Sequence, residues 1–287
     1  MPFVGLPEIL QGTVGADWAV GGFDTVNLEI TQAILEAAEA ERSPVIVMLL
    51  PGHTHLEDLP ALIAAIETEA KKVSAPVCLL LDHATNLPQV MTGIRLGCSA
   101  IMFDASGYPL EENIARTRQV VELAHAAGVS VEAELGHVGG GDESGAGVSL
   151  GSVLTQVEEA GRFVAETGVD ALAVSIGTAH GPYIKKPELD FERLKQLRAS
   201  LDLPLVLHGG SGNPDEDLRR LIELGIDKIN VWTDIALAYM GGIQTKLTAP
   251  DRSYPLHDIL EAGRVAAREV VAGRMRLFGS SGKVKAA

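Results

Sequence analysis

The stretch LPLVLHGGSGNPDEDLRRLIELGIDKINVWTD, residues 203–234, contains one complete strand–helix–strand unit. Its short apolar runs, Leu205–Leu207 and Lys228–Val231, predict strands, and Pro214–Leu224 between them has the apolar spacing of a helix. Other runs of this kind, such as Val45–Leu50, are apolar on both faces, as parallel strands covered by helices must be. The unit therefore predicts a parallel sheet whose strands are joined by helices.

The same alternation extends along the whole chain. Strands are expected at Trp18–Phe23, Val45–Leu50, Val77–Leu81, Ala100–Phe103, Ser130–Glu134, Ala171–Ser175, Leu205–Leu207 and Lys228–Val231. The clearest helices are Leu28–Glu41, Asp58–Val73, Leu110–Ala127, Val153–Thr167, Phe191–Ser200 and Pro214–Leu224. Eight such repeats predict an α/β fold of the (β/α)8 TIM-barrel type, with residues 1–287 as one domain and a C-terminal helical extension of one or two helices at about 253–287. An open doubly wound sheet is the alternative, but the chain has no GxGxxG after its first strand and no P-loop.

The composition limits the classes of protein to which the chain can belong. Of its 287 residues, 46% are hydrophobic, which excludes a disordered or fibrous chain. The formal net charge of -15 argues against a nucleic-acid partner. Cys78 and Cys98 lie in apolar contexts and are expected to be buried, reduced thiols. No signal peptide and no membrane-spanning run is apparent, so we expect a cytoplasmic protein with no membrane partner.

Polar residues recur at the carboxyl ends of six expected strands. They are Asp82, His83, Asp104, Glu132, Glu134, His180, His208, Asn230, Thr233 and Asp234. In a (β/α)8 barrel the carboxyl ends of the strands form the face on which active sites are built. The set therefore predicts a functional site at this mouth of the barrel.

Three of these residues are histidines that the barrel would bring together: His83, His180 and His208. Three neutral imidazoles with one open position are the ligand set of a catalytic Zn²⁺ site. The other histidines are expected to be solvated; they are His53, His55, His125, His137 and His257.

Two further loops have the features of an anion site. HGGSG, residues 208–212, follows the seventh strand, and NVWTD, residues 230–234, follows the eighth. Loops in these positions often bind phosphate in barrels. Gly209 and Gly210 allow close approach of backbone N–H groups, Ser211 adds a hydroxyl, and the helix after Thr233 directs its positive end to the same place. A phosphorylated small molecule is the expected ligand.

The motifs together resemble the class II, metal-dependent ketose-bisphosphate aldolases of the fructose- and tagatose-bisphosphate type. The matching strings are LDHATN (81–86), VEAELGHVGG (131–140), ETGVDALAVSIGTAHGPY (166–183), LDFERL (189–194), LPLVLHGGSG (203–212), GIDKIN (225–230) and RLFGSSGK (276–283). The resemblance runs from about Val20 to Lys283, nearly the whole chain.

The resemblance implies a role for each matching residue. His83, His180 and His208 would bind zinc, with Asp104 and Glu134 as alternative or second metal ligands. Asp82 would be the acid that serves the aldehyde oxygen, while Zn²⁺ stabilises the enediolate as a Lewis acid. Dihydroxyacetone phosphate would be held by Gly181, Gly209, Ser211 and the turn of Asn230, Val231, Trp232 and Thr233. A monovalent cation, Na⁺ or K⁺, near Gly181 and Gly209 and a homodimeric or homotetrameric assembly are further family features.

The chain departs from the family pattern in the loops around the aldehyde. The mobile-loop base is usually Glu, whereas this chain has Asp142 followed by Glu143, either of which is a candidate base. Asp24 stands where the family has a substrate-facing Asn, and Leu50-Pro51 where Ser or Thr is usual. Pro255-Leu256-His257 replaces an Asp-Pro-Arg whose Arg binds the second phosphate.

These departures predict an aldolase whose acceptor aldehyde carries no phosphate. Losing a bidentate Arg and gaining a carboxylate would weaken the binding of a second dianion. Arg252 and Arg264 are out of register with the missing Arg. Two other functions remain open: another metal-dependent barrel lyase or hydrolase that uses the same ligands, and a catalytically impaired, aldolase-like binding protein.

Overall fold

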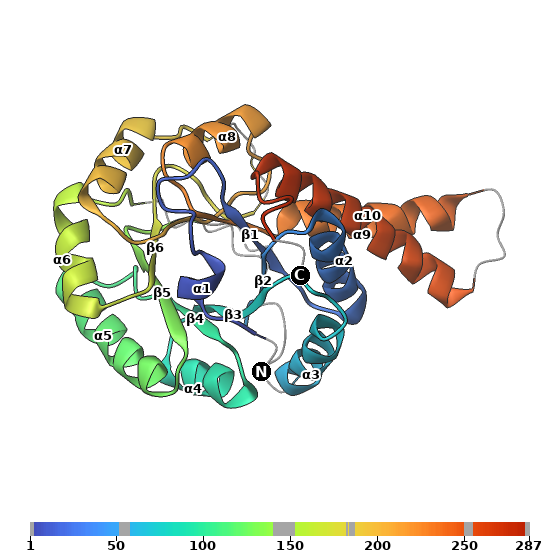
Figure 1. Cartoon of the computed structure of the whole chain (residues 1–287), viewed down its shortest axis with the longest axis horizontal. Helices are drawn as coiled ribbons and strands as arrows, with labels where there is room; N and C mark the ends of the chain where they lie inside the picture. The colour runs from blue at the N-terminus through green and yellow to red at the C-terminus, as the bar shows by residue number, and fades with distance from the viewer. Residues whose placement is uncertain are drawn as a thin grey trace.

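The computed structural model describes residues 3–51, 58–139, 153–181, 183, 187–249 and 255–284, and in these residues eight parallel strands form a closed barrel (Figure 1). The strands are β1 (Val20–Asp24), β2 (Val45–Leu49), β3 (Val77–Ala84), β4 (Ala100–Phe103), β5 (Ser130–Leu135), β6 (Ala171–Val174), β7 (Leu205–Leu207) and β8 (Lys228–Val231). Each strand pairs with the next, and β8 closes the ring by pairing with β1, with Val20 opposite Lys228. The predicted (β/α)8 barrel is confirmed, and the open doubly wound sheet is wrong.

Helices surround the barrel. Their bounds are α1 (Leu6–Ile9), α2 (Leu28–Glu41), α3 (Leu59–Ala70), α4 (Leu87–Leu96), α5 (Leu110–Ala126), α6 (Val157–Thr167), α7 (Phe191–Ser200), α8 (Asp215–Glu223), α9 (Thr233–Thr248) and α10 (Leu256–Leu277). The sequence does not predict α1 or α4. In α4 a proline in the first turn and Gly93 weaken the helical signal, yet a Cβ at Gly93 would lie within 3 Å of the Ile101 and Leu81 side chains. The glycine therefore lets α4 pack directly on β3 and β4.

Two apolar cores follow from the alternation of side chains along the strands. On β2, for example, Val45 and Val47 pack toward the helices, whereas Ile46 and Met48 point into the barrel. At the amino ends of the strands α1 closes the inner core, and the Ser130 hydroxyl accepts a hydrogen bond from the backbone N–H of Leu6 at 2.8 Å. The apolar floor leaves the opposite, carboxyl mouth of the barrel for polar groups.

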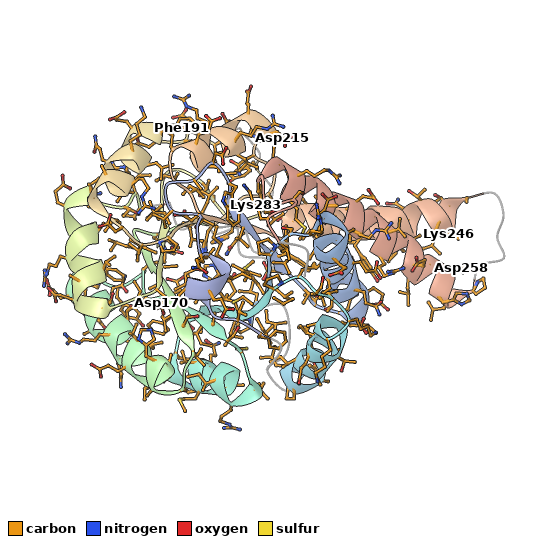
Figure 2. The ribbon with its side chains drawn as sticks, in the orientation of Figure 1. Asp170, Phe191, Asp215, Lys246, Asp258 and Lys283 are labelled. Atoms are coloured by element: carbon orange, nitrogen blue, oxygen red, sulfur yellow. The ribbon has the colours of Figure 1, made fainter. Side chains whose placement is uncertain are left out.

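Helices α9 and α10 pack against each other and project from the barrel (Figures 1 and 2). In the part of the predicted C-terminal extension that the structure describes, there is a single helix, α10, which also packs on α2 and brings the chain back to the barrel. There the Ala19 N–H donates to the carbonyl of Phe278 at 2.9 Å, and the Ser43 and Ser280 hydroxyls bond at 2.8 Å. Among the described residues, no helix is long and apolar enough to cross a membrane.

Candidate active site

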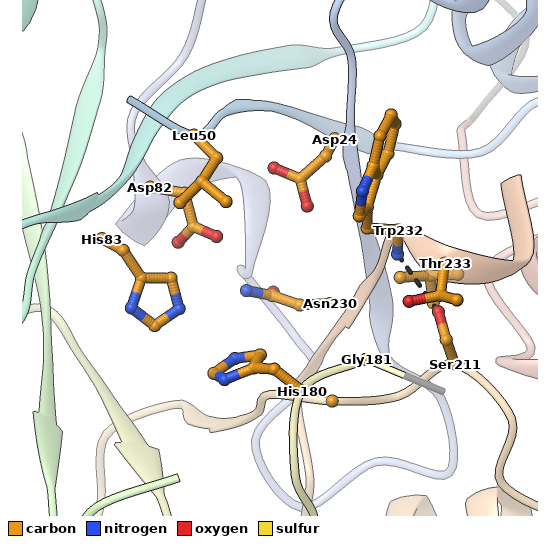
Figure 3. Close-up of a pocket in the computed structure, with 12 residues that line it drawn as sticks. Asp24, Leu50, Asp82, His83, His180, Gly181, Ser211, Asn230, Trp232 and Thr233 are labelled. Atoms are coloured by element: carbon orange, nitrogen blue, oxygen red, sulfur yellow. Dashed lines mark hydrogen bonds between the residues drawn. The ribbon is translucent and has the colours of Figure 1, made fainter. Parts of the chain in front are cut away.

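A pocket opens at the carboxyl mouth of the barrel (Figure 3). The residues that line it are Asp24, Leu50, Asp82, His83, His180, Gly181, Gly209, Ser211, Asn230, Val231, Trp232 and Thr233. The fold thus gathers most of the candidate site residues from strands that are far apart in the sequence. Leu50 is an additional, apolar member of the lining.

Asp82 and His83 both face this pocket although they are adjacent in β3. Neighbouring residues of a regular strand point to opposite faces. Here the pairing of β3 with β4 passes from Leu81 opposite Ile101 to Ala84 opposite Phe103, so β3 has one extra residue, a β-bulge. His83 takes a positive φ of 47°, a backbone conformation that is uncommon outside glycine. The bulge therefore places the carboxylate of Asp82 and the imidazole of His83 side by side in the pocket.

The rings of His83 and His180 line the pocket, and the fully buried ring of His208 converges with them. The ring centroids are 4.9 Å apart for His83 and His180, 4.8 Å for His83 and His208, and 5.6 Å for His180 and His208. One nitrogen from each ring lies within 4.8 Å of the others. The Nε2 of His83 and the Nδ1 of His208 are 3.0 Å apart. Two ligands of a tetrahedral Zn²⁺ are separated by about 3.4 Å, given bonds of about 2.1 Å, so the donor set and its spacing fit a metal ion.

Carboxylates hold the outer nitrogens of two of these rings. The Nδ1 of His83 lies 3.3 Å from Asp104, and the Nε2 of His208 lies 3.0 Å from the Oε1 of Glu132. A carboxylate beside the second ring nitrogen is the usual arrangement of a metal-binding histidine because it fixes the ring and its tautomer.

The surroundings lower the pKa of two of the three histidine rings and raise the pKa of the third. Burial, and then the charges of His83 and His208, lower the pKa of His180 well below its usual range. Burial also lowers the pKa of His208, although its ring is hydrogen-bonded to Glu132. Burial alone would lower the pKa of His83 too, but Asp82 and the hydrogen bond to Asp104 raise it to about 10. Since a metal ion binds neutral imidazole, it would compete with the proton on His83.

Asp104 and Glu134 form a second cluster with His83, again with one atom from each group within 4.8 Å of the others. Burial and then the charge of Asp104 raise the pKa of Glu134 to about 8. Its Oε1 accepts a hydrogen bond from the Val138 N–H at 2.8 Å, whereas its buried Oε2 has no hydrogen-bond partner among the described residues. Such an oxygen is suited to a cation.

The loops after β7 and β8 meet at the amino end of α9. The Ser211 hydroxyl accepts hydrogen bonds from the N–H groups of Trp232 at 3.2 Å and Asp234 at 3.3 Å, so it ties the two loops together. The Gly210 N–H donates to the carbonyl of Asn230 at 3.0 Å, and Gly210 is not a lining residue. Both amide atoms of the buried Asn230 side chain lack a hydrogen-bond partner among the described residues. The amide is thus placed to bind a ligand in the pocket.

Several residues around the site carry no role in the sequence prediction. Tyr183 joins the loops after β6 and β7, because its hydroxyl accepts from the Ala179 N–H and donates to the Gly209 carbonyl, both at 2.9 Å. His137 is not simply solvated, since its Nδ1 lies 2.8 Å from the Ser106 hydroxyl. Lys228 is fully buried and pairs with Glu132. Glu132 is among the polar residues that the sequence places at the mouth of the barrel, whereas the sequence assigns no role to its partner Lys228.

Other residues considered for the site do not line the pocket or lie outside the described residues. Asp142, Glu143 and Arg252 lie outside the described residues. Arg264 is bound by Glu36 and Glu261 on α2 and α10 and does not line the pocket. The segment Pro255-Leu256-His257 starts α10, where the His257 side chain is 81% exposed and pairs with Asp258.

Comparison with known proteins gives one consistent result. The model of the family described as "Fructose-bisphosphate aldolase class-II" matches residues 4–283. The chain is 41% identical to a "Probable fructose-bisphosphate aldolase" of Bacillus subtilis (strain 168), over 98% of this chain and 99% of the relative. It is 40% identical to a "Fructose-bisphosphate aldolase" of Geobacillus stearothermophilus, over 99% of both chains. The crystal structure of the YdjI aldolase from Escherichia coli K12 superposes with a TM-score of 0.83 at 31% identity, covering 99% of this chain and 100% of that chain.

Proposed function

We propose that this chain, which belongs to the class II fructose-bisphosphate aldolase family and is therefore a carbon–carbon lyase, depends on zinc for its aldolase activity. Its reaction is the reversible cleavage of a ketose phosphate to dihydroxyacetone phosphate and an aldehyde. The observation that carries this proposal is the convergence of His83, His180 and His208 beside Asp82 and the two anion-binding loops.

Zinc would be held by the three imidazoles, with Asp104 and Glu134 as alternative or second ligands. The family is metal-dependent. The Oε2 of Glu134, which lacks a hydrogen-bond partner among the described residues and lies 3.7 Å from the Nδ1 of His208, together with the ring spacing supports a cation here. When bound, the metal supplies a Lewis acid that polarises the carbonyl and hydroxyl oxygens of the ketose.

Asp82 is proposed to move the proton at the aldehyde oxygen. Its side chain is 3% exposed, lines the pocket beside His83, and has an Oδ1 without a hydrogen-bond partner among the described residues. A buried carboxylate within reach of the substrate is a suitable general acid–base. Asp142 and Glu143 remain proposed as the base that acts at the carbon next to the carbonyl, from outside the described residues.

The phosphate of dihydroxyacetone phosphate is assigned to Gly181, Gly209, Ser211 and the residues Asn230–Thr233. Within the described part of the chain, no Lys or Arg lines the pocket. The amide groups and the positive end of α9 would thus provide the attraction for the dianion, helped by a Na⁺ or K⁺ ion near Gly181 and Gly209. Gly210 contributes through the turn rather than through its N–H, which already donates to Asn230.

The acceptor aldehyde is proposed to carry no phosphate. Asp24 is 5% exposed and adds a carboxylate to the lining, and Leu50 adds an apolar side chain. Arg264, the described arginine considered for a second phosphate, is bound by two carboxylates instead. A dianion on the aldehyde side would meet Asp24 without a compensating arginine.

The test is a panel of ketose 1-phosphates and ketose bisphosphates assayed for cleavage, with the bound metal quantified in the same preparation. We expect about one metal ion per chain in the original protein and none in the His83→Ala variant. We also expect a higher kcat/KM for a ketose 1-phosphate than for fructose 1,6-bisphosphate. A preference for the bisphosphate contradicts the acceptor proposal. Full activity of metal-free protein contradicts the metal mechanism, and phosphate-ester hydrolysis without carbon–carbon cleavage indicates a barrel hydrolase.

A further inference from the structure

A charged pair lies inside the barrel directly below the histidine cluster. The Nζ of Lys228 on β8 is 3.0 Å from the Oε1 and 2.8 Å from the Oε2 of Glu132 on β5. The same Oε1 is 3.0 Å from the Nε2 of His208. All three side chains are fully buried. They form a chain from one wall of the barrel to the metal-binding candidate.

The fold makes room for this pair at some cost. Other side chains that point into the barrel, such as Met48 and Leu80, are apolar. A Cβ at Gly22 would lie 2.8 Å from the sulfur of Met48 and 3.3 Å from the Cε of Lys228, so the glycine provides the space that the lysine stem occupies. A buried ion pair is seldom more stable than a pair of apolar residues of similar volume. Stability alone therefore does not explain why β5 and β8 carry these charges.

The explanation lies in the two nitrogens of His208. A carboxylate only accepts hydrogen bonds, so the nitrogen facing Glu132, Nε2, carries the ring proton. The neutral ring then presents the lone pair of Nδ1, which lies 3.0 Å from the Nε2 of His83 and faces the point where the three rings converge. Without a partner at Nε2, the ring could take either tautomer or turn over.

We infer that Glu132 and Lys228 are positioning residues that fix the tautomer and orientation of His208, so that its Nδ1 is the metal-binding atom. Glu132 lies close enough to Asp82 and His208 to be counted as a metal ligand itself. Its two oxygens are, however, engaged by Lys228, and one of them also by His208. Lys228 therefore holds the carboxylate in place for the ring. The inference rests on the proposed metal function of the three histidines.

The experiment measures metal binding rather than turnover. Paired neutral replacements avoid leaving one buried charge alone. The variant Glu132→Gln with Lys228→Met keeps an acceptor for the His208 N–H, whereas Glu132→Met with Lys228→Met removes it. The matched control is Asp227→Asn with Arg198→Met, which replaces another ion pair, 3.0 Å between Arg198 Nη1 and Asp227 Oδ2, that touches none of the three histidines.

Affinity for Zn²⁺ and Co²⁺ is determined by competition with a chromophoric chelator, and the visible spectrum of bound Co²⁺ reports the ligand geometry. We expect the Met/Met pair to bind about 10- to 100-fold more weakly with an altered Co²⁺ spectrum. The Gln/Met pair should recover part of this loss, and the control should stay within about twofold of the original chain. Equal affinity and an unchanged spectrum in the folded Met/Met pair overturn the inference.

A second measurement needs no variant. In the chain labelled with ¹⁵N-histidine and loaded with Cd²⁺, ¹⁵N spectra should show His208 protonated at Nε2 and coupled to the metal through Nδ1. The opposite tautomer overturns the inference even if the Met/Met pair fails to fold. If the original chain binds no metal, or if His83→Ala does not remove the bound metal, the proposed function itself is contradicted. Failure of the proposed function is therefore distinguishable from failure of the inference about His208.

Discussion

Replacing Gly209 by alanine should weaken the metal site although Gly209, which is assigned to the phosphate site, is not one of the candidate zinc ligands. Gly209 has a φ of +67° and lies where the loop after β7 meets the loop after β6. A Cβ built there would be 2.8 Å from the carbonyl carbon of Ala179 and closer still to its oxygen. That carbon is about 0.6 Å short of the 3.4 Å at which ordinary contact begins, so the backbone of Ala179 must move by at least this amount. The next residue is His180.

Two costs are expected and can be separated. The left-handed conformation costs an alanine about 1–2 kcal/mol, and forcing an extra carbon into a packed site adds about 1–3 kcal/mol. A displacement approaching 1 Å in a catalytic group can lower kcat/KM about 100-fold, so we expect a loss of about 10- to 100-fold together with weaker metal binding. The measurements are kcat/KM for cleavage, the dissociation constant for Zn²⁺ and the free energy of unfolding.

Two control variants share the conformational cost. Gly128 has a φ of +73° with no neighbouring atom within 4 Å of a Cβ, and lies between α5 and β5. Gly97 has a φ of +92° at the end of α4, again with no neighbouring atom within 4 Å of a Cβ. Both alanine variants should lose stability but keep most of their metal affinity. If Gly209→Ala binds zinc and turns over as Gly97→Ala does, the predicted displacement of His180 is refuted.

The remaining predictions concern the metal, the acid and the thiols. Dialysis against a strong chelator should abolish cleavage, and Zn²⁺ at about 100 times its dissociation constant should restore it and raise the free energy of unfolding by about 2.7 kcal/mol; an unchanged melting temperature on adding Zn²⁺ speaks against binding to the folded state. Asp82→Asn should retain zinc while kcat falls about 10²- to 10⁴-fold, and near-normal turnover would remove Asp82 from the proposed acid role. Burial raises the pKa of both Cys78 and Cys98 to about 12, so neither thiol should react with a disulfide reagent at pH 8 until the chain unfolds. Rapid labelling of the native protein would contradict this.

Much of the fold was predictable because its signals are local. The apolar run and the following helix of each repeat are read within about 30 residues, and eight such repeats are sufficient for a barrel. The barrel in turn places residues that follow the strands at one mouth, which is why His83, His180 and His208 could be grouped before any coordinates. The helix α4 escaped prediction because Gly93 has low helix propensity but is required for close packing on β3 and β4.

The acceptor side of the site was predictable only in part. The carboxylate of Asp24 and the apolar side chain of Leu50 were expected at strand ends, and both line the pocket. The engagement of Arg264 by Glu36 and Glu261 depends on how α10 packs on α2, which no local pattern encodes.

The sequence by itself determined the barrel, the mouth at which polar groups gather and the chemical types available there. Tertiary structure alone decided how each group is held. The bulge between Leu81 and Ala84 turns both Asp82 and His83 into the pocket, and it exists only through the pairing of β3 with β4. The contacts from His208 to Glu132 and from Glu132 to Lys228 join residues 76 and 96 positions apart. The local pattern of apolar and polar residues indicates which face of its own strand a residue occupies. Its partner across the barrel is determined only when the sheet closes.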